Sequence, residues 1–191
     1  MNGHESHGGH ERLVPDERLP PYSYVTGRFP HPTRDSSGHS FGRPPDAPPP
    51  VHPDRWSQSR TYLLGCDLFN LGYYWEAHET WEAVWKACGR RGAVADFLKA
   101  LIKLAAAGVK AREGRPTGVQ RHAARAAQLL RGVRNQISAA TYLGLDVDEL
   151  IAIADRLKRG IELPEPSAAP VQIVFGFRLL PRSGDSMHDA G

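Results

Sequence analysis

Glycine residues divide the centre of the chain into short segments with helical patterning. Between residues 54 and 160 apolar residues recur at helical spacing, and Gly72, Gly89, Gly114 and Gly160 stand where four such segments end. Glycine readily adopts the left-handed conformation in which many helices end. The pattern predicts five helices, over about residues 54–71, 73–87, 93–112, 116–133 and 147–159.

Only short connections separate most of these predicted helices. Short connections make consecutive helices run antiparallel, because the chain has no length to cross the bundle. Asp146 or Asp148 is placed to cap the last helix. We find no pair of strand-like segments joined by a hairpin turn inside residues 54–160. The sequence therefore predicts an all-α antiparallel bundle of about five helices.

Both ends of the chain differ in composition from the centre and are rich in proline. Residues 1–52 also hold many Gly, His and Ser residues, which is typical of an extended or disordered arm. Some apolar side chains could hold this arm against the bundle as a strap: Tyr22, Tyr24, Val25, Phe29 and Phe41. We divide the chain into this arm, a helical domain at 53–160 and an irregular tail at 161–191. Residues 171–180 fit either a strand or an extended docking segment.

Composition excludes several classes of protein. The formal net charge is +3 and is spread along the chain, which argues against an obligate nucleic-acid binder. The apolar runs are much shorter than the roughly 20 residues that cross a bilayer, so no membrane association is expected. The first residues contain no apolar signal region, and the two cysteines, Cys66 and Cys88, suit a reducing compartment. We expect a cytoplasmic protein, and a homo-oligomer remains open.

The second predicted helix carries the densest group of aromatic and ionisable residues. At about 100° per residue, its core stripe includes Trp81 and has His78 at the rim. Glu82 lies one turn after His78, and Glu79 lies beside it. His78, Glu79 and Glu82 are therefore the candidate catalytic residues, and with Trp81 they are candidate ligand contacts.

The neighbouring helices bring further ionisable residues to this level. An antiparallel register with the third helix places Lys99 level with Glu82, and Lys103 level with His78. The fourth helix adds His122, one turn from the level of Lys103. Asp67 on the first helix comes level with His78 as an outer member.

The proline-rich arm adds two candidates. Arg34 and His39 lie on the stretch that could fold over the bundle, where they would complete a cleft.

Three interpretations of this cluster stay open. It could be a layer of ion pairs and hydrogen bonds between helices, since buried charges are usually paired. It could be a binding cleft, because aromatic walls with a few polar groups suit small molecules. It could also be an acid–base or metal centre. The segment His-Glu-x-x-Glu lacks the second histidine of a zinc-binding helix, and di-iron Glu-x-x-His pairs are missing, so no metal ligand and no cofactor is assigned.

Particular residues in this region resemble the domain of unknown function 309 family. They are Phe69-Asn70, Gly72, Glu76-Ala77-His78-Glu79, Trp81-Glu82 and Trp85, followed by the Phe97–Ile102 run and by Gly118, Arg121 and His122. The likeness covers about residues 57–135. It implies a small helical bundle with the Glu-Ala-His-Glu helix at its centre. It implies no reaction and supplies no catalytic residues.

Taken together, the residues predict a helical domain that binds a small polar ligand or a partner. The predicted contacts are His78, Glu79, Trp81, Glu82, Lys103, His122, Arg34 and His39. One alternative is a hydrolase-like enzyme in which Glu79 or Glu82 is the general base and His78 is the acid or a metal ligand. The other is a scaffold in which the cluster is purely structural.

Overall fold

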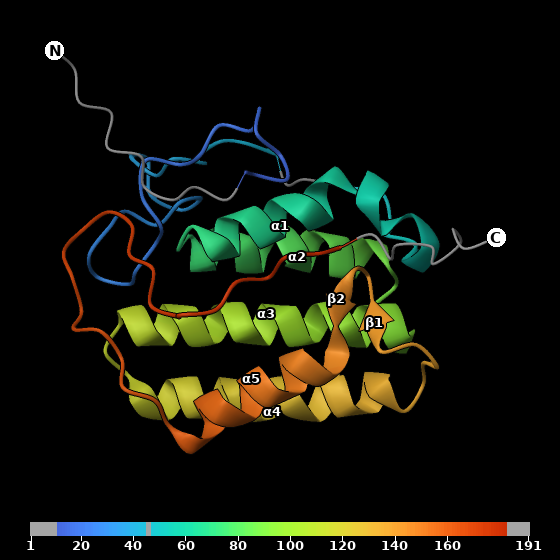
Figure 1. The fold of residues 1–191 in the computed structure, drawn as a ribbon. Coiled ribbons are helices and arrows are strands. Elements are labelled where there is room, and N and C mark those ends of the chain that lie inside the picture. The colour runs from blue at the N-terminus through green and yellow to red at the C-terminus, as the bar shows by residue number, and fades with distance from the viewer. Residues whose placement is uncertain (1–10, 45–46, 183–191) are drawn as a thin grey trace, which may run out of the picture.

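A computed structural model describes residues 11–44 and 47–182 (Figure 1). In this part of the chain a 3-10 helix, η1 (Pro53–Gln58), precedes the α-helices α1 (Arg60–Asn70), α2 (Tyr74–Ala87), α3 (Gly92–Arg112), α4 (Pro116–Arg134) and α5 (Val147–Arg159). Figure 1 shows α1 and α2 on one side of α3, and α4 and α5 on the other side. The predicted all-α bundle is confirmed. None of the described helices combines the length and the apolar character needed to cross a membrane.

The helix ends follow the local signals in the sequence. Gly72, Gly89, Gly114 and Gly160 all have positive φ, between 69° and 95°, just after α1, α2, α3 and α5. Asp146 caps α5, since its Oδ1 accepts a hydrogen bond of 2.9 Å from the backbone N of Glu149. The first predicted helix is divided, because Arg55 has non-helical backbone angles and α1 begins only at Arg60.

A small hairpin corrects the prediction that no strand pair lies within residues 54–160. Strands β1 (Thr141–Tyr142) and β2 (Leu145–Asp146) pair antiparallel, with Tyr142 opposite Leu145. The two turn residues between them have positive φ, 48° for Leu143 and 79° for Gly144. Leu143 is buried, and its carbonyl accepts a hydrogen bond of 2.8 Å from the Tyr62 hydroxyl. Tertiary contacts therefore hold a turn that leucine would not favour by itself.

The proline-rich arm lies against α1 and α2 as a strap in residues 11–44. The buried carboxylate of Asp67 accepts hydrogen bonds from the backbone N of Leu13, at 3.0 Å, and of Val14, at 2.8 Å. Ten residues further along the strap, the carboxylate of Glu76 accepts a bond of 2.9 Å from the backbone N of Tyr24. Two carboxylates of the bundle thus satisfy backbone donors of a segment that has no regular structure of its own.

The tail after α5 contains no strand in its described part, so residues 171–180 form an extended docking segment. Asn70 fixes this segment from both sides, since its amide nitrogen donates to the carbonyl of Leu179 and its amide oxygen accepts from the Leu179 backbone N. The side chains of Val174 and Phe175 are buried in the core. In Figure 1 the tail runs from the end of α5 past the strap and back across the helices.

Candidate functional site

Trp81 belongs to the core and does not line a cleft. Its side chain is fully buried, and the indole N–H donates a hydrogen bond of 3.1 Å to the carbonyl of Tyr62. Gly65 on α1 leaves the space that the indole ring occupies. The most prominent aromatic residue of the predicted site therefore joins α2 to α1.

The other predicted residues of α2 lie at its surface. The side chains of His78, Glu79 and Glu82 are 28%, 47% and 26% exposed. His78 Nδ1 lies 3.3 Å from a carboxylate oxygen of Glu79, and Glu82 accepts a hydrogen bond of 3.0 Å from Lys86. Partial burial raises the pKa of Glu82, but the bond from Lys86 and nearby positive charges, among them Lys99, lower it below its usual value. Glu82 is therefore an ionised carboxylate that already has a partner.

The register between α2 and α3 agrees with the prediction, because Gly108 on α3 packs directly against the ring of Tyr74 on α2. From its position on α3 the Lys99 side chain reaches along the helix, so that its Nζ atom lies 3.9 Å from the centroid of the Trp85 ring. A cation above an aromatic face is stabilised by the ring quadrupole. The Tyr74–Gly108 contact places Lys103 level with His78 and Glu79. Lys103 still influences Glu82 electrostatically.

Positive residues of α3 and α4 face one another along the antiparallel helices. A methyl group on Gly118 would lie 2.9 Å from Cγ of Lys110, which fixes the register. This register puts Arg125 level with Lys103. Burial lowers the pKa of Lys103, and the charges of Lys99, Arg125 and Arg121 lower it further.

His122 lies within the same group of positive charges. Burial, followed by the charges of Lys103, Arg121, Lys110 and His78, lowers the pKa of His122 to about 4. The imidazole is therefore neutral at pH 7. His78 on α2 is the last and smallest of these influences on His122.

We name this surface the basic face and define it by its members on α3 and α4. They are Lys99, Lys103, Lys110, Arg121, His122 and Arg125. His78 and Glu82 form its border on α2. At one end the face continues into a hollow of about 420 Å³ that is lined by Lys110, Arg115, Thr117, Gly118 and Arg121. The hollow is thus an extension of a positively charged surface.

The strap residues of the predicted site lie elsewhere. Arg34 is exposed, and His39 is directed to a different acid of α2, with its Nε2 atom 3.3 Å from Oε1 of Glu76. The side chains of His39 and Glu76 are only 8% and 6% exposed. Residues that are two positions apart on a helix face different directions, so His39 is not brought to His78. The buried Asp67 likewise serves the strap.

Two buried residues that anchor the strap and the tail were not predicted from the sequence. Besides Glu76, Arg112 at the end of α3 is almost fully buried. It donates hydrogen bonds to the carbonyls of Ser23, at 3.2 Å, Pro170, at 3.3 Å, and Ala169, at 2.8 Å. A basic residue in the last turn of a helix is ordinary, so the sequence gave no reason to expect it inside. Glu76 follows the buried Tyr73 by one turn, which was the available indication that it faces inward.

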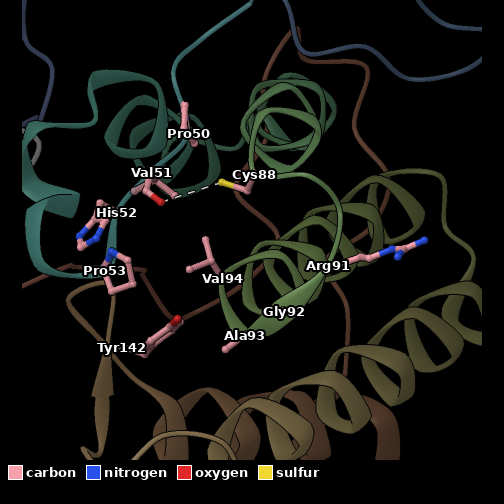
Figure 2. Close-up of a pocket in the computed structure, with 10 residues that line it drawn as sticks. All are labelled: Pro50, Val51, His52, Pro53, Cys88, Arg91, Gly92, Ala93, Val94 and Tyr142. Carbon is pink, nitrogen blue, oxygen red and sulfur yellow. Dashed lines mark hydrogen bonds between the residues drawn. The ribbon is translucent and has the colours of Figure 1, made fainter.

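A second hollow, of about 320 Å³, opens between η1, the start of α3 and the β-hairpin (Figure 2). Its walls include Val51, Val94 and Tyr142, and Figure 2 shows the Arg91 side chain extending away from them. The Cys88 thiol is 3.9 Å from the carbonyl of Val51, and burial raises the pKa of Cys88. A protonated thiol is a poor nucleophile. None of the predicted site residues lines this hollow.

Groups of metal-binding side chains do not occur in the described residues. Within 11–44 and 47–182, no three His, Cys, Asp or Glu side chains gather as ligands of one ion.

Comparison with protein families identifies the central part of the chain. Residues 62–122 match the family described as Domain of unknown function (DUF309), in agreement with the resemblance seen in the sequence. The matched segment runs from α1 into α4 and includes His78, Glu82, Lys103 and His122. No curated protein matches the chain.

Proposed function

We propose that the basic face binds a small anionic ligand, one that carries a phosphate or a carboxylate group. The supporting observation is a contrast along α4. Arg131 pairs with Asp155, and Arg134 pairs with Asp148, at 3.1 Å. By contrast, Arg121 forms no ion pair within the described chain, and the described contact of Arg125 is a hydrogen bond of 2.6 Å to Gln128. One half of the helix is neutralised by α5, and the other half keeps its charge.

The unneutralised charges have a physical cost that an anion would remove. Burial is the main reason why the pKa values of Lys103 and His122 are lowered, and the like charges held near them lower these values further. An anion placed between them would reverse this effect and favour protonation. Arginine is well suited to this role, since its planar group can bind a phosphate or carboxylate through two hydrogen bonds.

Glu82 and His78 border the proposed anion site and are not its main contacts. Glu82 is the nearby carboxylate, and its bond to Lys86 keeps its negative charge at the border of the face. His78 lies at the same border. This arrangement favours ligand binding over acid–base catalysis, because an acid–base mechanism requires a carboxylate whose pKa lies near the working pH.

The proposal is tested by titrating the full chain with inorganic phosphate and pyrophosphate at low salt. Thermal shift and calorimetry would report binding, and Arg121→Gln and Arg125→Gln should each weaken it by about tenfold, the usual effect of losing one charge-assisted contact. Arg156→Gln is the matched control, because Arg156 is an exposed arginine on α5 and its loss changes the net charge equally. Equal binding by all variants would refute the proposal, as would no binding of either anion.

A further inference from the structure

The chain contains five lysines, and the structure describes all of them. Lys86 pairs with Glu82 at 3.0 Å, and Lys110 pairs with Glu113 at 2.7 Å. Lys99 lies 3.9 Å above the Trp85 ring. Lys158 is exposed in the last turn of α5. Four of these lysines are thus stabilised in the charged form by a neighbour or by water.

Lys103 differs from the other lysines in its surroundings. It is partly buried, and no carboxylate from the described residues forms an ion pair with it. The acid that acts on it electrostatically, Glu82, is bonded to Lys86. Cations stand on both sides, Lys99 on its own helix and Arg125 on α4.

This environment makes the free amine more accessible at Lys103 than at the other lysines. Burial and neighbouring positive charge both disfavour the ammonium form, and burial is the larger cause of its lowered pKa. A lysine next to other cations is a recognised form of activated amine, because the free amine and not the ammonium is the nucleophile. His122, which also faces this region, is neutral at pH 7 and supplies no negative charge that would stabilise the ammonium form of Lys103.

We propose that Lys103 captures the carbonyl group of an anionic aldehyde or keto acid as an imine. This inference rests on the proposed anion site, in which Arg121 and Arg125 would hold the ligand's negative group. The Lys103 nitrogen attacks the carbonyl carbon and the C=O π pair moves to oxygen, which gives a carbinolamine. The nitrogen gives up both of its protons and the oxygen takes up two, through solvent, so the oxygen leaves as water and the nitrogen lone pair forms the C=N bond. No oxidant or reductant takes part.

The test uses three aldehydes of similar size: glyoxylate, glycolaldehyde phosphate and neutral glycolaldehyde. Cyanoborohydride, added as a reagent, reduces any imine to a stable secondary amine, and peptide mass spectrometry gives the rate at each lysine. We expect both anionic probes, or the one whose anionic group fits, to label Lys103 at least about tenfold faster than Lys158, in line with local concentration by a charged surface. Neutral glycolaldehyde should show no such preference.

Two variants separate this inference from the proposed function. Lys103→Arg keeps the positive charge but has no primary amine, so labelling at this position should disappear whatever its phosphate affinity. Arg125→Gln should lose both phosphate binding and the preference for anionic probes. If phosphate binds but Lys103 reacts no faster than Lys158, the imine is refuted and the anion site stands. If phosphate does not bind and Lys103 reacts equally with all three probes, both proposals fail.

Discussion

The contact between α1 and α2 depends on the absence of a side chain at Gly65. A Cβ atom at this position would lie 2.6 Å from both Cδ1 and Cε2 of the Trp81 indole. Both residues are fully buried, so neither the ring nor the backbone has open space to move into. Gly65→Ala must therefore displace the indole, together with its hydrogen bond to the carbonyl of Tyr62.

One favourable and two unfavourable contributions determine the expected change in the free energy of unfolding. Alanine in place of glycine in a helix gains about 1 kcal/mol from helix propensity. Overpacking of a full core costs about 1–3 kcal/mol. Leaving the buried indole N–H of Trp81 without its acceptor costs about 1–3 kcal/mol more. The net effect is a destabilisation of about 3 kcal/mol, or roughly 6–12 °C in Tm for a chain of this size.

Urea denaturation followed by tryptophan fluorescence would measure this loss. Gly132→Ala is the matched control, since Gly132 also lies inside a helix, α4, and nothing lies within 4 Å of the position of its Cβ. The control should gain about 0.5–1 kcal/mol. A Gly65→Ala protein as stable as the wild type would contradict the placement of Trp81 in the core.

Two further predictions concern residues described above. Because the pKa of His122 falls from 6.5 to about 4 on folding, the unfolded chain binds its proton first, and stability should decrease as the pH falls from 6.5 towards 4. After allowance for solvent screening of this half-buried group, His122→Gln should remove about 1 kcal/mol of that dependence, measured by urea denaturation at pH 7 and pH 5. Arg112→Met should cost about 2–3 kcal/mol, since it removes bonds to carbonyls of the strap and the tail. Limited proteolysis near Ser23 and Ala169 should then become faster, and unchanged cleavage would argue against an anchoring role.

Helix boundaries were predictable because their signals are local. Gly72, Gly89, Gly114 and Gly160 lie just beyond four of the helices in the left-handed conformation, and Asp146 caps α5 through a residue three positions away. The β-hairpin was not predictable for the opposite reason. Its strands hold two residues each, and Leu143 adopts a positive φ only where Tyr62, far away in sequence, binds its carbonyl.

The members of the candidate cluster were predictable, but their partners were not. Helical spacing alone brings His78 and Glu82 to one side of α2, and antiparallel packing brings Lys103 and His122 to the same region. The register of α3 on α2 was predictable too, as the contact between Gly108 and Tyr74 shows, but the packing of Lys99 on Trp85 depends on side-chain conformation, which spacing does not determine. The roles of buried acids could not be inferred either, because their partners are backbone groups of an irregular strap about 50 residues away.

The acids of α2 face different surroundings, and this difference provides a test of what the basic face binds. Glu76 serves the strap, whereas Glu82 lowers the positive potential at Lys103. If the ligand is an anion, Glu82→Gln removes a repelling charge and should tighten phosphate binding, by about three- to tenfold for the loss of one partly exposed charge. If Glu82 instead contacts the ligand as a hydrogen-bond acceptor, the same change should weaken binding. Calorimetry with phosphate on the Glu82→Gln protein distinguishes these cases. Glu79→Gln is the control, because Glu79 is more exposed and pairs with His78. Weaker phosphate binding by Glu82→Gln would mean that the cations of α3 and α4 are not the main contacts.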